Sequence, residues 1–142
     1  MRPTDHDAHP TFTHRRLDVY HAALDFVQLA ATIVQGFPRG HGHMADQLRR
    51  ASISIPLNIA EGAGEFSARD KARFYRIARR SALECAAVMD LARVLGLAED
   101  DGVRQAIAVL RRIVAMLTQL ISRWGRIENE PETERETETE RG

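Results

Sequence analysis

One short segment, residues 47–61, carries polar side chains at spacings that could build a hydrogen-bonded or ligand-lining row. The row consists of Gln47, Ser54, Asn58 and Glu61, which follow one another at intervals of seven, four and three residues. Such intervals place side chains on one face of an α-helix. Apolar residues between them predict that the segment is buried, and buried polar groups are costly unless they find partners.

This polar row has two interpretations. In the first, it forms an interhelical hydrogen-bond network with Ser81 and Glu84, which are three residues apart on a later helix, and the network fixes register and partner choice. In the second, the same side chains line a cavity or pore in an assembled oligomer. The pattern favours the network, and both interpretations stay open at the level of sequence.

A second set of residues is basic. Four arginines at intervals of four, three and four predict a stripe along one helix: Arg69, Arg73, Arg76 and Arg80. Further basic residues on the neighbouring helices are Arg49, Arg50, Arg104, Arg111 and Arg112. Arginine binds phosphate in a bidentate manner, so the stripe is either an ordinary solvated face or a track for an RNA or DNA backbone. Because we assign Phe74 to the core, binding should be backbone-directed and weakly sequence-specific.

Catalytic and metal-binding patterns are weak in this sequence. A di-iron centre in a helical bundle needs Glu-x-x-His pairs, and no glutamate here has a histidine three residues later. His41 and His43 fall in a glycine-rich loop without further ligands, and Cys85 falls in an apolar row, where it should be a small buried residue. We therefore expect no catalytic residues, no metal, no cofactor and no enzymatic activity.

The composition fits one helical domain. The 142 residues are 44% hydrophobic and only 6% aromatic, and the formal net charge is zero. Residues 128–142 hold seven glutamates and two arginines, a net charge of −5, so the remaining chain carries +5. A mildly basic body permits a nucleic-acid partner. No signal segment and no uncharged apolar run of about 20 residues is visible, so we expect a soluble cytoplasmic protein without a membrane role.

Hydrophobic periodicity predicts four helices, over about residues 15–35, 44–60, 67–95 and 100–127. Ser67 followed by Asp70 is a capping-box pattern, and Gly96 should end the third helix. Pro56 should kink or break the second helix, because proline donates no backbone hydrogen bond. Short connections predict an all-α fold, an antiparallel up-and-down four-helix bundle.

The expected organisation is a flexible N-terminal arm (1–13), the four-helix bundle (14–127) and a disordered acidic tail (128–142). The first and fourth helices carry apolar faces wider than one neighbouring helix can cover. This surplus predicts an interface between subunits, and hence a homo-oligomer.

Three elements of the sequence carry a family resemblance: Q-L-R-R-A at 47–51, S-I-P-L-N-I-A-E-G at 54–62, and F-Y-R-I-A-R-R-S-A-L-E at 74–84. Over about residues 15–124 the chain resembles the four-helix bundle proteins encoded in intervening sequences of 23S ribosomal RNA genes. The resemblance implies an oligomer, a pentamer in particular, without established enzymatic activity. It also implies a relation to the accessory subunit of diversity-generating retroelements, which works with nucleic acid and a reverse transcriptase.

The leading hypothesis is therefore a non-enzymatic, homo-oligomeric accessory or scaffold protein that binds RNA or DNA through a basic face. A protein–protein interaction module with no nucleic-acid role is the alternative.

Overall fold

The computed structural model describes residues 12–129, and these residues are almost entirely helical. A short 3₁₀ helix, η1 (Thr13–Arg16), precedes four α-helices: α1 (Asp18–Gln35), α2 (Gly42–Gly64), α3 (Ala68–Val94) and α4 (Asp100–Glu128). The predicted all-α, four-helix fold is confirmed. Most of the predicted arm and acidic tail lies outside the described residues. Of the described residues in these two segments, Thr13 begins η1 and Glu128 ends α4.

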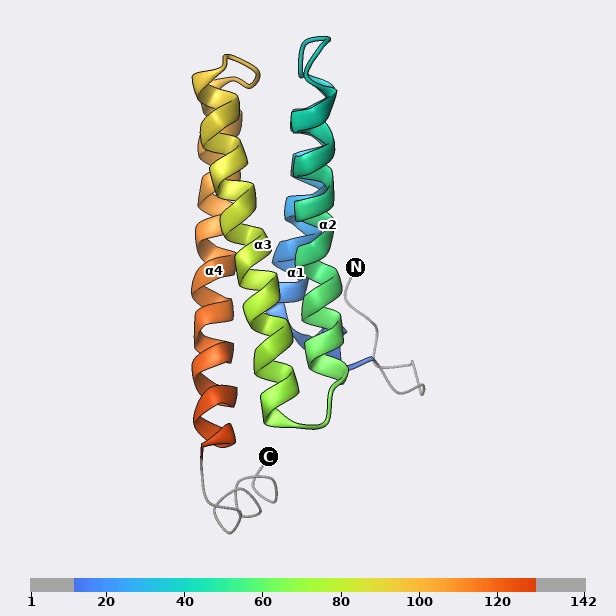
Figure 1. The fold of residues 1–142 in the computed structure, drawn as a ribbon, viewed down its shortest axis with the longest axis vertical. Coiled ribbons are helices and arrows are strands. Elements are labelled where there is room, and N and C mark those ends of the chain that lie inside the picture. The colour runs from blue at the N-terminus through green and yellow to red at the C-terminus, as the bar shows by residue number, and fades with distance from the viewer. Residues whose placement is uncertain (1–11, 130–142) are drawn as a thin grey trace.

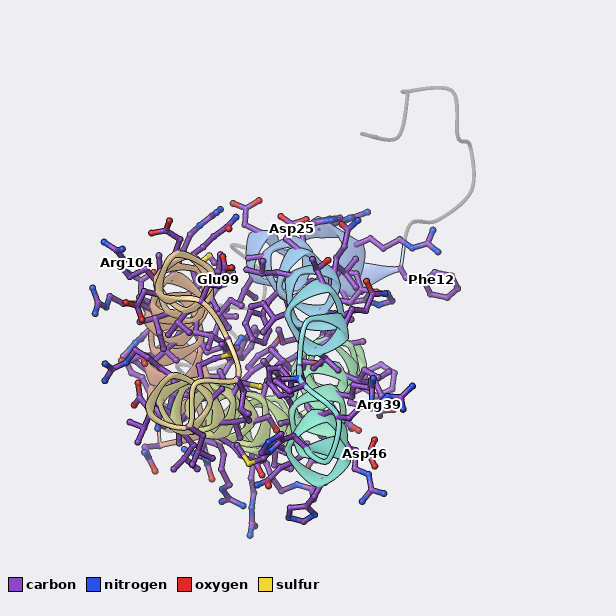
Figure 2. All side chains as sticks on the ribbon, turned by 90° about the horizontal axis from the view of Figure 1, so that it is seen from above. Phe12, Asp25, Arg39, Asp46, Glu99 and Arg104 are labelled. Atoms are coloured by element: carbon purple, nitrogen blue, oxygen red, sulfur yellow. The ribbon has the colours of Figure 1, made fainter. Side chains whose placement is uncertain are left out.

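The four helices run alternately up and down (Figure 1). Contacts between α2 and α3 show that these two helices are antiparallel, because an early residue of one helix contacts a late residue of the other. Gln47 contacts Glu84, Ser54 contacts Ser81, and Gly62 lies against Tyr75. Seen along the bundle, the helices surround a shared core and the charged side-chain tips lie at the periphery (Figure 2). α3 packs most extensively, against both α2 and α4.

Two helix ends follow the sequence signals closely. The Ser67 hydroxyl accepts a hydrogen bond of 3.0 Å from the backbone N–H of Asp70, as an N-cap should. At the other end of α3, Gly96 has a φ of 71°, and its N–H donates to the Arg93 carbonyl while the Leu97 N–H donates to the Ala92 carbonyl. This is a Schellman motif, so both predicted boundaries of the third helix are confirmed.

The second helix differs from its prediction. α2 is longer than 44–60, and it continues through the buried Pro56 without a break. Residues 62–64 lie beyond the predicted end at residue 60 and are its last helical residues. Gly62 is needed there for close packing, because an added Cβ would lie 2.9 Å from Cε1 of Tyr75.

Aliphatic and small side chains fill the core. The largest fully buried ones include Phe26, Leu48, Ile55, Ile59, Met89, Leu110, Ile113 and Leu117. On α3 the assignment of Phe74 to the core is wrong, because Tyr75 is the buried residue, only 2% exposed, whereas Phe74 is half-buried. The assignment rests on a seven-residue apolar repeat along α3, which runs from Phe74 through Ala78 and Cys85. Such a repeat drifts around a straight helix, so it marks the core face in the middle of α3 and not at its start.

By length and composition alone, α4 is the one helix in residues 12–129 that is long and apolar enough to cross a membrane. Its pattern is also that of an amphipathic bundle helix. Val103, Leu110, Ile113 and Leu117 are buried in the bundle, while its arginines are exposed.

Candidate nucleic-acid interface and interhelical polar network

The centre of the polar row lies between α2 and α3. The hydroxyl oxygens of Ser54 and Ser81 are 2.8 Å apart, and Asn58 Nδ2 donates to the Ser54 carbonyl at 2.8 Å and to the Ser54 hydroxyl at 3.0 Å. Ser81 is 8% exposed, and Ser54 and Asn58 are half-buried. The structure therefore joins these three residues into one small network that spans the α2–α3 contact.

The ends of the row are connected loosely or not at all. Gln47 Nε2 lies 3.5 Å from Glu84 Oε1, the limit of a hydrogen bond, and both side chains are exposed. Glu61 is exposed and makes no side-chain hydrogen bond to any residue of the described chain. Periodicity places these residues correctly on one face of α2. It cannot show that the side chains at both ends of the row are exposed to solvent.

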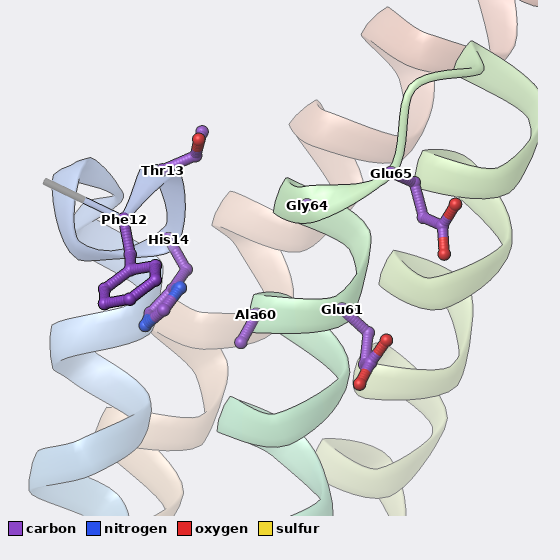
Figure 3. A pocket seen from close by; sticks show the side chains of 7 residues that line it. All are labelled: Phe12, Thr13, His14, Ala60, Glu61, Gly64 and Glu65. Carbon is purple, nitrogen blue, oxygen red and sulfur yellow. The ribbon is translucent and has the colours of Figure 1, made fainter. Parts of the chain in front are cut away.

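Glu61 instead borders an open hollow of about 730 Å³ beside η1 (Figure 3). Its side chain and that of Glu65 point away from the Phe12 and His14 rings, which stack with centroids 5.9 Å apart. The carboxylates of Glu61 and Glu65 and the ring of His14 therefore do not converge on one point in this hollow. Within residues 12–129, no group of three or more histidine, cysteine, aspartate or glutamate side chains could hold a metal ion.

Cys85 is buried, as predicted, with none of its surface exposed. Burial, reinforced by the nearby Glu84 carboxylate, raises the pKa of the Cys85 thiol to about 12. A thiol that stays protonated and inaccessible cannot act as a nucleophile near neutral pH.

The four arginines of the predicted stripe, Arg69, Arg73, Arg76 and Arg80, lie on the α3 face that points away from the core, and all are exposed. We call this set the α3 stripe. Among residues 12–129, Arg73 alone of the four forms a salt bridge, to Asp70 at 3.8 Å, and both partners are largely solvated. Such a pair contributes little to stability, so the stripe keeps its charge available.

Arg49 and Arg50 on α2 are also exposed. Arg49 pairs with Asp46 at 3.1 Å, whereas Arg50 borders the same surface hollow as Glu84, one turn of α3 beyond Arg80. Arg50 therefore continues the α3 stripe more directly than Arg49 does.

Two of the α4 arginines named from the sequence, Arg104 and Arg111, are not near the α3 stripe. Arg104 and Arg111 border a hollow with Asp90 and Arg93, at the opposite end of α3. The residues that sequence reasoning missed are at the other end of α4. Arg76 approaches Gly125, and the Arg123 guanidinium lies 5.2 Å from the Trp124 ring. Antiparallel pairing of α3 with α4 is the signal that would have indicated them.

Lys71, the single lysine, ties three helices together. Its Nζ donates to the carbonyls of Gly62 and Ala63 at 3.3 and 3.0 Å and lies 5.2 Å from the Trp124 ring centroid. Burial lowers the pKa of Lys71, and the Glu65 carboxylate partly opposes this. A cation at the C-terminal end of α2 also satisfies carbonyls that lack helical donors.

The exposed apolar surface lies mainly on α2 and α3, not on α1 and α4 as expected. One groove of about 230 Å³ between α1 and α2 is lined by Tyr20, Leu24, Val27, Ile53, Pro56, Leu57 and Ala60. Ile53 and Leu57, expected to be buried, are 47% and 59% exposed. A second apolar strip follows the α3 stripe along the same helix and consists of Leu83, Leu91, Val94 and Leu95. Within Asp100–Glu128, no large apolar residue of α4 is as exposed as these.

Comparison with known proteins adds one finding. No curated protein matches the chain. A family model described as 23S rRNA-intervening sequence protein matches residues 15–119, which include α1, α2, α3 and most of α4. The match covers well over half of the chain and the elements on which the resemblance rested. The chain therefore belongs to the family of 23S rRNA-intervening sequence proteins.

Proposed function

We propose that this chain is a non-enzymatic accessory or scaffold protein that assembles into a homo-oligomer and binds RNA or DNA through the α3 stripe. The observation that carries the proposal is a row of four exposed arginines on one helix face, of which only Arg73 has a carboxylate partner among the described residues. From Arg69 to Arg80 the row extends along about 16 Å of helix, so it can contact several successive phosphates.

Binding through this row should be dominated by phosphate contacts. Each arginine that neutralises a phosphate releases counterions, so affinity falls as salt rises. Contacts of this kind carry no sequence information directly. An accessory protein that tolerates many sequences fits this chemistry, and a reverse transcriptase is the protein partner that the resemblance to retroelement accessory subunits suggests.

Self-association is supported by the two exposed apolar surfaces, the α1–α2 groove and the strip at the end of α3. They lie on different parts of one subunit, which suits a head-to-tail interface that closes into a ring. Five subunits is the number that the family resemblance favours. Light scattering at micromolar protein should give a mass several times 16.0 kDa; a monomer mass would contradict the assembly.

The test of nucleic-acid binding is a salt series with a short mixed-sequence RNA and the matching DNA. Arg73→Glu combined with Arg76→Glu should abolish binding and leave the helical content unchanged. Arg104→Glu with Arg111→Glu is the matched control, because it makes the same charge change at exposed positions far from the α3 stripe.

The intact protein should lose affinity steeply between about 50 and 200 mM salt. Neutral single substitutions in the α3 stripe should each reduce the log–log salt slope by about 0.7–0.9. If the two glutamate variants bind equally well, the stripe is an ordinary solvated face.

A protein–protein interaction module is the second candidate. The apolar α1–α2 groove favours it, because grooves of this kind accept apolar side chains of a partner helix. Absence of RNA and DNA binding even at low salt would make this candidate the better one. Under either function we place the protein in the cytoplasm.

A further inference from the structure

Phe66 is the most exposed large apolar residue of the described chain, with a relative exposure of 102%. It lies in the short connection between α2 and α3, directly before the N-cap Ser67. An apolar residue at this position commonly packs on the fifth residue after it, as a hydrophobic staple. Here that residue is Lys71, whose amine is engaged by α2 carbonyls. Phe66 is thus left without its usual intramolecular partner.

The ring lies at the beginning of the α3 stripe. Phe66 and Arg69 are three residues apart, so their Cα atoms are separated by at most about 11 Å. Arg69 is exposed and forms no salt bridge with any residue in 12–129. An exposed aromatic face next to unneutralised guanidinium groups combines the two elements by which proteins hold single strands: stacking and backbone contacts.

The other aromatic residues near the stripe cannot provide a free ring face. Tyr75 is 2% exposed, the guanidinium of Arg73 covers the Phe74 ring at 4.6 Å, and Trp124 has Lys71 and Arg123 over its ring. Phe66 is therefore the ring beside the α3 stripe that remains open to a base.

We infer that Phe66 stacks on an unpaired base of a strand whose phosphates lie along the α3 stripe, which makes single-stranded RNA or DNA the preferred ligand. The inference rests on the proposed function and specifies its ligand class. A duplex buries its base faces in stacking, so it can use the arginines and not the ring. Stacking on a phenyl ring tolerates any base, which agrees with a site that reads little sequence.

The test compares one short mixed-sequence RNA as a single strand and annealed to its complement, with the full-length protein. Phe66→Leu keeps an apolar side chain and removes the aromatic face. It should weaken single-strand binding roughly 5-fold or more and leave duplex binding unchanged. Phe66→Tyr should restore single-strand affinity. Phe12→Leu is the matched control, because Phe12 is also exposed but lies on the η1 side of α2 (Figure 3).

A spectroscopic readout separates stacking from a structural role. Phe66→Trp should show indole fluorescence that is quenched by the single strand and not by the duplex, measured against the intact protein, which has Trp124 alone. Equal single-strand affinity of the intact protein and Phe66→Leu would overturn the inference and leave the proposed function standing. An intact protein that binds neither form would overturn both.

Discussion

The two halves of α3 carry similar side chains toward the core and chemically different side chains toward solvent. Toward the core, both halves present small residues without exposed surface: Ala72, Ala78, Ala82, Cys85 and Ala92. Toward solvent, the first half carries the α3 stripe. The second half continues the same helical spacing with the apolar strip, whose four members are 51–73% exposed.

This difference separates the residues of α3 whose identity is determined by packing within the subunit from those whose identity is not. Most of the inner residues are small because α2 and α4 pack on both sides of α3, with Tyr75 and Met89 as the large exceptions, so their identity reports the fold. Within residues 12–129 the outer residues make few contacts: of the α3 stripe, Arg73 alone forms a salt bridge, and the apolar strip is largely exposed. In the proposed function, the arginines meet phosphates and the apolar strip meets a protein surface.

The largest effect should come from replacing exposed apolar residues in the second half of α3 with arginine, so that this half resembles the first. Leu91→Arg with Val94→Arg should dissociate the oligomer, because an unpaired charge buried at an interface costs on the order of 3–5 kcal/mol. Light scattering or sedimentation should show a lower mass, while a circular dichroism spectrum stays helical. Gln105→Arg with Gln119→Arg adds the same charge at exposed α4 positions and should leave the mass unchanged. A full-size oligomer in the first variant would place the subunit interface elsewhere.

A second test concerns the inner face where the two halves meet, at Ser81. Asn58→Leu leaves the Ser54–Ser81 pair without its amide donor. The expected loss is about 1–3 kcal/mol in the free energy of unfolding, measured by urea denaturation at matched protein concentration. RNA affinity should not change, since Asn58 is half-buried and is not part of the α3 stripe. Gln28→Leu, an exposed polar residue on α1, is the control. If both variants unfold alike, the polar row is merely solvated.

The smallest effects should come from glycines. Gly62→Ala places a methyl group against the Tyr75 ring and should destabilise the fold by about 1–2 kcal/mol. Gly102→Ala meets nothing within 4 Å in the first turns of α4 and should stabilise it by about 0.5–1 kcal/mol. Thermal unfolding of the two variants should therefore shift in opposite directions, and a shift in the same direction would argue against close packing at Gly62.

The fold was predictable because helix signals are local. Ser67 and Gly96 determine both ends of α3 through hydrogen bonds within a few residues. Pro56 was misleading because its effect depends on surroundings: it lies buried against the bundle, where packing holds the helix together despite one missing donor.

The candidate site was predictable in part. Periodicity found the arginines of the α3 stripe, since they share one helix. It could not show that the end of α4 around Gly125 lies beside Arg76 while Arg104 lies at the opposite end of α3, because that depends on how α3 and α4 are aligned. It also missed Phe66, whose exposure follows from the unusual engagement of Lys71 and not from any local pattern.

The engagement of Lys71 has a practical consequence for chemical labelling. Because Lys71 is the single lysine, it supplies the only side-chain primary amine in the sequence. That amine is held by two carbonyls and an indole face. Amine-directed acylation or cross-linking should therefore proceed slowly on the folded protein and accelerate when the C-terminal end of α2 separates from α3. The rate of Lys71 acylation is thus a chemical measure of local opening at this end of the bundle.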